Sequence, residues 1–295
     1  MTTADTFASG KGHRDENFPV ASWLVRRDAR APILAFYRFA RAADDVADHA
    51  SASPADKLEQ LARLEAGLGG DRAASGEGWA LHEVLQARGL GDRHPLDLLE
   101  AFRRDVGKTR YADWAELMDY CRYSAAPVGR FVLDVHGESP ALWPANDALC
   151  SALQVINHLQ DCAKDYRALD RVYLPLDVLA AHGARVESLA AARSCDGLRQ
   201  TIRVLARRTG GLLEQSRPFA GRIADRRLGL EVGVIQSLAE NLVQRLGRRD
   251  PLCERVHHRP IEALGLALRG AGGVMAGWLG RAVRPAPPAM RGSGG

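Results

Sequence analysis

The sequence predicts an all-α protein, because apolar residues recur at helical spacing along almost the whole chain. Strict alternation of apolar and polar residues, the pattern of a half-buried strand, is scarce. The 295 residues are 46% hydrophobic and 26% charged, which is typical of a globular protein and excludes disorder over most of the chain.

The helical pattern divides into separate segments. We expect helices over residues 28–50, 57–67, 79–88, 94–107, 113–137 (with a kink at Pro127), 146–169, 176–182, 186–192, 196–219, 220–247 and 261–283. Residues 1–16 are expected to be flexible, and the Pro/Gly-rich residues 284–295 to be disordered. No linker interrupts residues 17–283, so a single domain is predicted there.

Charge and cysteine content narrow the class of protein. The net charge of +4 is mild and the basic residues are dispersed, so a nucleic-acid partner is not expected. Five cysteines without a CxxC pair indicate reduced thiols in the cytoplasm. The N-terminus has no apolar signal segment, and no apolar run is long enough for a confident transmembrane helix. The nearest candidate, residues 261–283, is interrupted by Arg269 and is expected to be a packed terminal helix rather than a surface-lying membrane helix.

Polar residues form a stripe on the otherwise apolar segment 28–50. Tyr37, Arg41, Asp44 and Asp48 are spaced by four, three and four residues. That spacing places them on one face of a helix, on successive turns. Because apolar residues flank the stripe on both sides, its two carboxylates are predicted to lie in a largely apolar environment.

The segment 146–169 repeats this pattern. Gln154, Asn157, Asp161 and Asp165 are spaced by three, four and four residues, again between apolar flanks. One aspartate pair alone would be interpreted as a solvated helix face. Two such stripes, each ending in carboxylates four residues apart, favour a shared function.

Carboxylates in apolar surroundings require a compensating cation, since burying one without a partner is costly and burying two together costs more. Oxygen ligands without clustered histidines favour Mg²⁺ over zinc. The four aspartates of the two stripes are therefore predicted metal ligands. Because Mg²⁺ commonly joins one or two carboxylates to phosphate oxygens, the predicted substrate is a diphosphate whose remainder is hydrocarbon.

This site predicts carbocation chemistry. Metal-assisted loss of diphosphate from an allylic or cyclopropylcarbinyl carbon leaves a cation, which needs a dry cavity with aromatic groups nearby. No serine or cysteine nucleophile is required, and Cys121 and Cys162 are expected to be small packing residues. His158, next to the second stripe, is expected to be a packed residue rather than a proton acceptor.

The stripe segments, "FYRFARAADDVADH" and "NHLQDCAKDYRALDRVYLP", resemble the two aspartate-rich motifs of the squalene/phytoene synthase family. The segment "YCRYSAAPVGRFV" between them is similar to a third family signature, and "GKTRYADWAELMDYC" upstream of it also resembles the family. The resemblance extends from about Asn17 to the last long helix. It implies a single-domain, all-α isoprenoid-synthase fold, with two aspartate-rich helices facing each other across a central apolar cavity.

The resemblance also implies residue roles. It assigns Asp44 and Asp48 to the first Mg²⁺–diphosphate motif and Asp161 and Asp165 to the second, all as catalytic metal ligands, and gives Tyr120 a role in the first ionisation. It implies substrate binding by the following residues: Asn17, Tyr37, Arg41, Tyr123, Gln154 and Asn157.

Departures from the family pattern indicate a branch. Gln160 replaces the arginine that usually precedes Asp161, and Lys164 replaces an acidic residue. These changes, with the start "ENFPVAS", resemble the bacterial branch that forms hydroxysqualene in hopanoid biosynthesis. The implied reaction is Mg²⁺-dependent ionisation of presqualene diphosphate, rearrangement of the cation, and capture by water.

Two other functions stay open at this point. One is the synthesis of presqualene diphosphate or phytoene by head-to-head condensation of two prenyl diphosphates. The other is a non-catalytic lipid-binding or assembly role, which the presence of all four aspartates disfavours. The main interpretation implies an upstream presqualene diphosphate synthase, a downstream reductase, and a cytoplasmic protein with peripheral contact with the inner membrane surface.

Overall fold

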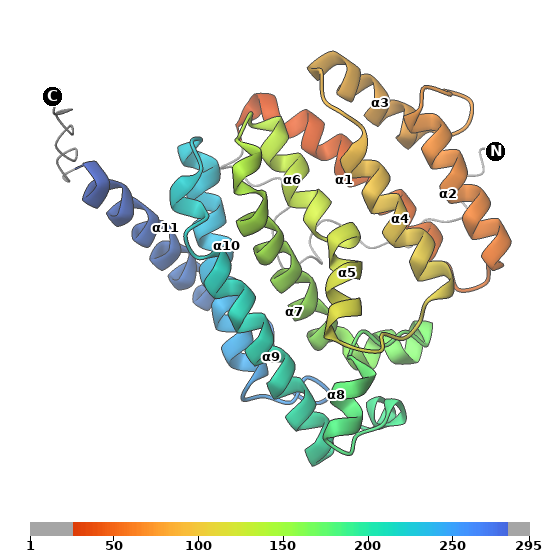
Figure 1. Cartoon of the computed structure of the whole chain (residues 1–295), viewed down its shortest axis with the longest axis vertical. Helices are drawn as coiled ribbons and strands as arrows, with labels where there is room; N and C mark the ends of the chain where they lie inside the picture. The colour runs from red at the N-terminus through yellow and green to blue at the C-terminus, as the bar shows by residue number, and fades with distance from the viewer. Residues whose placement is uncertain (1–25, 283–295) are drawn as a thin grey trace, which may run out of the picture.

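The computed structural model describes residues 26–282, which fold into α-helices joined by short turns (Figure 1). The helices are α1 (Arg27–Ala47), α2 (Pro54–Leu68), α3 (Gly76–Arg88), α4 (Arg93–Gly107), α5 (Trp114–Ser124), α6 (Ala126–Val135), α7 (Trp143–Leu169), α8 (Leu176–Ala181), α9 (Asp196–Ser216), α10 (Arg226–Leu246) and α11 (Pro260–Ala282), with 3₁₀ turns η2 (Pro140–Leu142), η3 (Val186–Ala190) and η4 (Ala220–Arg222). Within residues 26–282 no strand forms, and the prediction of an all-α fold is confirmed. The expectations for residues 1–16, Asn17 and residues 284–295 concern positions outside the described range.

Several helix starts follow from capping side chains in the sequence. Ser53 accepts a hydrogen bond from the backbone N–H of Asp56, whose carboxylate accepts in return from the N–H of Ser53, and Pro54 occupies the first turn of α2. Asp225 caps α10 by accepting from the N–H groups of Arg227 and Leu228, at 2.9 and 3.1 Å. α10 therefore starts at Arg226, after η4, and not at residue 220 as predicted.

Three other differences from the predicted helices change an element or the position of a site residue. The single helix expected over residues 113–137 is instead two helices, α5 and α6, because Pro127 lacks a backbone N–H and its ring opposes continuation of the preceding turn. Residues 186–190 form a 3₁₀ turn rather than an α-helix. α1 ends at Ala47, so Asp48 is its C-terminal cap and does not lie inside the helix as expected.

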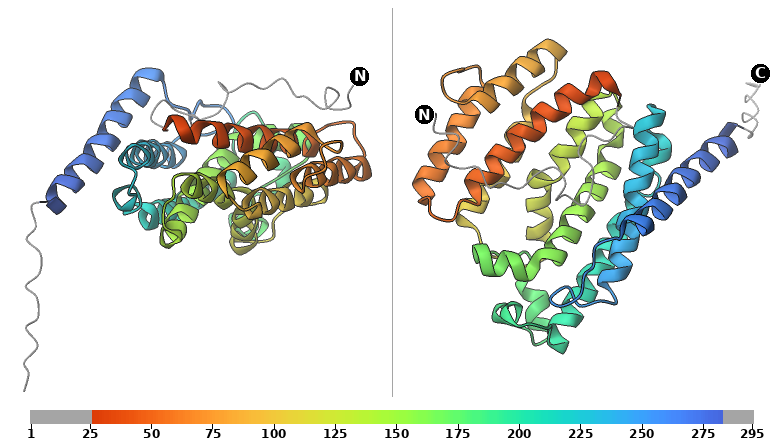
Figure 2. Two further views of the ribbon diagram at one scale, coloured as in Figure 1. Left: turned by 90° about the horizontal axis from the view of Figure 1, so that it is seen from above. Right: turned by 180° about the vertical axis from the view of Figure 1, so that it is seen from behind.

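The core consists of two clusters of buried apolar side chains. One lies among α1 to α4 and α6 and includes Phe36, Phe39 and Leu99. The other lies around α7, which packs against α9, and includes Leu149 and Ile156. Figure 2 shows α1 to α4 on one side of the long helix α7 and α9 to α11 on the other. The space between the two clusters is where a cavity can form.

The last helix, α11, packs on α10 through small residues. A Cβ atom added to Gly270 would lie 2.3 Å from the carbonyl oxygen of Gly233, so the two backbones are in close contact. Packing was expected for this segment, but it involves one face of the helix only. No helix within residues 26–282 is long and apolar enough to span a membrane.

Candidate functional site

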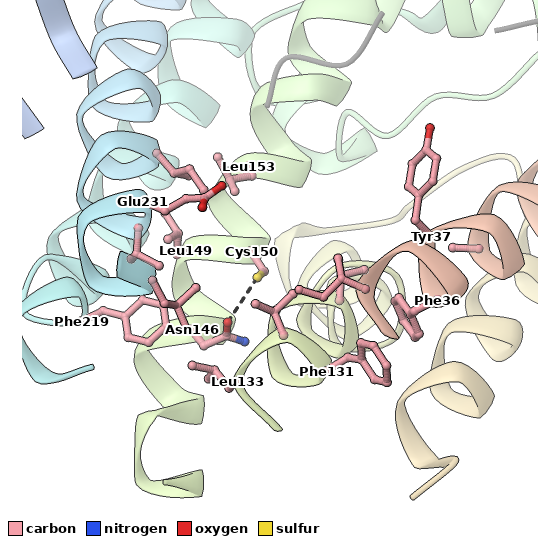
Figure 3. A pocket seen from close by; sticks show the side chains of 18 of the residues that line it. Phe36, Tyr37, Phe131, Leu133, Asn146, Leu149, Cys150, Leu153, Phe219 and Glu231 are labelled. Carbon is pink, nitrogen blue, oxygen red and sulfur yellow. Dashed lines mark hydrogen bonds between the residues drawn. The ribbon is translucent and has the colours of Figure 1, made fainter. Parts of the chain in front are cut away.

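A cavity of about 420 Å³ lies between α1, α6, α7 and α10 (Figure 3). Its volume is in the range of small-molecule sites. The walls are mainly apolar and include Ile33, Phe36, Phe102, Phe131, Val132, Leu133, Leu149, Leu153, Phe219, Leu228, Val232 and Ile235. Tyr37, Arg41 and Asp44 supply polar groups from α1, and Asn146 and Glu231 supply them from α7 and α10. The cavity thus combines hydrocarbon walls with a polar edge on α1.

The first predicted stripe lies at this polar edge. The Arg41 guanidinium donates to Asp44 at 2.9 Å and to Asp45 at 2.7 Å. Tyr37, Arg41 and Asp44 all line the cavity, as the predicted common face requires. They are half-buried, so water and a charged ligand can still reach them.

Asp48, one turn further on, pairs with a residue that the stripe argument did not select. Its carboxylate accepts a hydrogen bond from Nη1 of Arg171 at 2.9 Å, and the Arg171 side chain is only 8% exposed. Nη2 of Arg171 donates to the backbone carbonyl of Asp105 at 3.1 Å. The segment that carries Arg171 is fixed in place because the Val172 N–H donates to the carbonyl of Thr109. Arg171 therefore joins α1, α4 and the end of α7.

Below this pair lies a buried network centred on Asp105. Its carboxylate accepts hydrogen bonds from the hydroxyls of Tyr120 at 2.7 Å and Tyr173 at 3.3 Å. Burial raises the pKa of Asp105 to about 6, against the opposing effect of the Arg171 charge. Tyr120 is thus held in this network and is not among the residues that line the cavity.

His158 packs against the same network. Its ring stacks on Tyr173 with 3.5 Å between ring centroids. Burial, and then the Arg171 charge, lower the pKa of His158 to about 3, so the imidazole is neutral at physiological pH. The prediction of a packed histidine is confirmed. Cys121 and Cys162 are also buried, with thiol pKa values raised to about 12 by burial, in agreement with a packing role.

The second stripe carries the most perturbed carboxylate on α7. The pKa of Asp165 is raised to about 7, mainly by burial and to a smaller extent by the charges of Asp161 and Asp48. Lys164 and Arg171 oppose this shift. Asp48 belongs to the other stripe, and its charge is among those that raise the pKa of Asp165, which indicates that the two stripes lie near each other. Gln154 and Asn157 lie half-buried on the same helix, two turns and one turn before Asp161, respectively.

The arrangement fits a metal ion that is bound partly by protein carboxylates and partly by a ligand, rather than one that the protein encloses completely. Among residues 26–282 no group of three or more His, Cys, Asp or Glu side chains could hold a metal by itself. Asp161 and Asp165 nevertheless lie together with excess negative charge, and the nearest ammonium, Lys164, is 3.9 Å from Asp161. Oxygen donors from two helices, completed by diphosphate and water, suit the coordination that Mg²⁺ prefers.

Asp165 provides a pH-dependent prediction. We expect the metal-free protein to lose stability as the pH rises from about 4 to 7, and Asp165→Asn to remove much of that loss. The folded-state pKa of about 7 lies above the ordinary 3.8, so the stability from this group is complete below about pH 4 and is lost as the pH rises through 7. Melting temperatures in EDTA at pH 5, 6 and 7 check this. Equal pH dependence in both proteins would contradict it.

The other predicted and unpredicted residues complete the site. Tyr123 does not line the cavity: the guanidinium of Arg104 lies 4.1 Å from its ring centroid, and that of Arg122 lies 5.6 Å away. Sequence reasoning missed Asp105 and Glu231 and treated Arg171 and Tyr173 only as part of the helix-breaking "RVYLP". Arg171 and Tyr173 could have been predicted as site residues, because an arginine and a tyrosine follow the second carboxylate stripe closely in the sequence.

Comparison with known proteins agrees with this geometry. The squalene/phytoene synthase family model matches residues 12–262. A hydroxysqualene synthase of Rhodopseudomonas palustris is 57% identical over 262 residues, covering 89% of this chain and 90% of the relative. One of Zymomonas mobilis is 54% identical and covers 92% of each chain.

A solved structure extends the agreement to the fold. The crystal structure of squalene synthase HpnC from Alicyclobacillus acidocaldarius superposes with a TM-score of 0.66 at 33% identity, covering 78% of this chain and 87% of that one. The predicted isoprenoid-synthase helical fold is thereby confirmed, and so is the prediction that the protein is an enzyme. The chain belongs to the squalene/phytoene synthase family.

Proposed function

We propose that the protein is a hydroxysqualene synthase, which converts presqualene diphosphate and water to hydroxysqualene and diphosphate. The observation that carries the proposal is the position of the two carboxylate stripes. Asp44 lines an apolar cavity, Asp48 accepts a hydrogen bond from Arg171, and the charges of Asp48 and Arg171 both act on the buried Asp165. Relatives that are more than half identical and bear this name support the same reaction.

Diphosphate would bind at the carboxylate edge of the cavity. Asp44, Asp48, Asp161 and Asp165 would hold Mg²⁺, which supplies neutralising charge for the leaving diphosphate. Arg41 orients Asp44 and Asp45 through its two hydrogen bonds. Arg171 holds Asp48 from the buried side, so that this carboxylate is already in place when the substrate arrives.

The hydrocarbon part of the substrate would occupy the apolar cavity. Phe36 and Phe131 stack with 4.3 Å between ring centroids and form part of its wall. Aromatic faces stabilise a nearby cation, and the apolar walls limit the water that could capture it before rearrangement is complete. The cavity therefore suits a carbocation that must survive until its skeleton has changed.

Capture of the rearranged cation requires one water molecule inside this apolar space. Glu231 and Asn146 are polar residues of the cavity wall outside the stripe on α1, and Figure 3 shows both side chains at the α7–α10 side. A water oxygen held there would form the new C–O bond with its lone pair. The proton that this oxygen then releases would pass to the Glu231 carboxylate.

Glu231→Gln tests this assignment. The amide can still hold water but cannot take up the proton, so we expect hydroxysqualene to fall by about 10² relative to dehydrated hydrocarbon products, at the lower end of the effect of a general base. Product ratios measured by gas chromatography check this. Glu240→Gln, on the same helix but outside the cavity lining, serves as the control. An unchanged ratio in the Glu231 variant would rule out its role in water capture.

The function itself is tested by the product. Purified protein with presqualene diphosphate and Mg²⁺ should yield hydroxysqualene, and EDTA should stop the reaction. If the protein leaves presqualene diphosphate untouched and consumes farnesyl or geranylgeranyl diphosphate, it is instead a synthase that condenses two prenyl diphosphates head to head.

A further inference from the structure

α11 exposes large apolar side chains along its whole length. Ile261, Leu264, Leu268, Met275 and Leu279 are 48–85% exposed. The last four lie 3, 7, 14 and 18 residues after Ile261. At 3.6 residues per turn, this spacing places all five within about 60° of one another around the helix axis. We refer to these five side chains as the α11 stripe.

The α11 stripe lies opposite the face that packs on α10. Gly270 and Val274 are the contact residues: Cβ atoms added at Gly233 would lie 2.4 Å from Val274 and 3.2 Å from the Gly270 carbonyl. On a helical wheel these two residues point away from the stripe. In Figure 2, α11 runs along the outer edge of the molecule, and its C-terminal end points away from the other helices. Among residues 26–282, nothing covers the stripe.

The sequence that contains α11 is positively charged, which favours an anionic partner for the α11 stripe. Residues 245–295 contain nine arginines and three acidic residues, a formal charge of +6 that exceeds the +4 of the whole chain. Glu262, the acidic residue within α11, is already paired with Arg245 at 2.9 Å. Arg269, on the helix, and Arg259, directly before it, are both exposed. An apolar stripe next to unbalanced positive charge is the pattern of a helix that lies on an anionic membrane surface.

We propose that α11 docks the protein on bilayers that contain anionic phospholipid, with the α11 stripe in the boundary between headgroups and acyl chains. The helix would lie on the membrane and not span it, in agreement with its hydropathy. A second copy of the chain is a poorer occupant, because a dimer through this face would bring two positively charged segments together. α10, on which α11 sits, carries the cavity-lining Val232 and Ile235, so docking would place the cavity one helix away from the lipid.

Vesicle sedimentation tests the proposal with the full chain. We expect binding to vesicles of phosphatidylcholine with phosphatidylglycerol, and much weaker binding to phosphatidylcholine alone. Leu264→Asp with Leu268→Asp should weaken binding more than tenfold, because both changes place charge in the apolar face. Arg269→Ala should weaken it about fivefold, the effect of one basic residue near an anionic surface. Leu58→Asp, at an exposed leucine of α2, is the matched control and should bind like the parent.

Two results would overturn the proposal. In the first, the Leu264/Leu268 variant sediments with anionic vesicles as strongly as the parent does. In the second, the parent fails to bind vesicles but is a dimer that the same variant dissociates, so a second copy covers the stripe. Turnover in detergent micelles is measured alongside and should be equal in parent and variant. If the parent shows no turnover, that result counts against the proposed reaction. It does not count against docking, because docking does not depend on the reaction.

Discussion

Arg171→Met is expected to lower the free energy of unfolding by about 3–5 kcal/mol at neutral pH, the usual result of removing one partner of a buried ion pair. The Arg171 side chain is 8% exposed and donates to Asp48 and to the backbone of Asp105. Methionine keeps most of the volume but leaves the Asp105 carboxylate buried without a nearby cation. Urea denaturation followed by circular dichroism measures the loss.

The loss should depend on pH in a definite direction. Arg171 lowers the pKa of Asp105, which burial raises to about 6, so the variant carboxyl has a still higher pKa. At pH 5 the carboxyl is mostly protonated in both folded proteins, and the difference in stability is smaller. As the pH rises through 6, the parent holds a charged carboxylate beside its cation, whereas the variant must bury it alone or keep it protonated. The difference in stability should therefore grow between pH 5 and 8.

Arg110→Met is the matched control for this variant. Arg110 also pairs with an aspartate, Asp170, at 2.5 Å, but the Asp170 carboxylate is exposed. An exposed pair contributes about 0–1 kcal/mol, so this variant should be nearly as stable as the parent. If the two arginine variants lose equal stability, or if the Arg171 variant shows no pH dependence, the Arg171 charge does not stabilise the buried network around Asp105.

Most of the fold could be predicted from the sequence because the residues that determine a helix lie close together along the chain. Periodic apolar residues and capping side chains such as Ser53 lie within a few positions of the helix they define. The errors occurred where a single residue or a tertiary contact determines where a helix begins or ends. Pro127 separates α5 from α6, and Asp225 delays the start of α10. Both residues were visible, but the periodicity on either side favoured one continuous helix.

The site was predictable only where its residues share a helix. Asp44 lies with Arg41 on α1, and Asp161 lies with Asp165 on α7, so spacing alone grouped each set. The contact of Asp48 with Arg171 joins positions 123 residues apart, and no periodicity encodes it. Asp105 is similar: its environment comes from Tyr120 and Tyr173, which approach only in the folded chain.

Asp161→Asn is expected to reduce turnover by about 10² to 10³ with little change in stability. The effect on rate is that of removing one group that stabilises the charge developing on the leaving diphosphate. The effect on stability is small because the Asp161 side chain is 44% exposed and its ion pair with Lys164 spans 3.9 Å, so little is lost when the charge is removed. Because the Asp161 charge raises the pKa of Asp165, the variant should also lower that pKa towards its ordinary value.

A matched surface variant separates a metal-binding role from a general effect of charge. Asp119 is 48% exposed and pairs with Arg104 at 2.8 Å, but it does not line the cavity, so Asp119→Asn should keep full turnover. Mg²⁺ titration of activity adds a second measurement. If Asp161 helps to hold the ion, its variant should require a higher Mg²⁺ concentration for half-maximal rate, whereas a residue that only shapes the cavity would lower the maximal rate without changing that concentration. Full turnover of Asp161→Asn at the parent's Mg²⁺ requirement would show that the carboxylates of α7 do not bind the metal, and the mechanism would then have to rest on α1 alone.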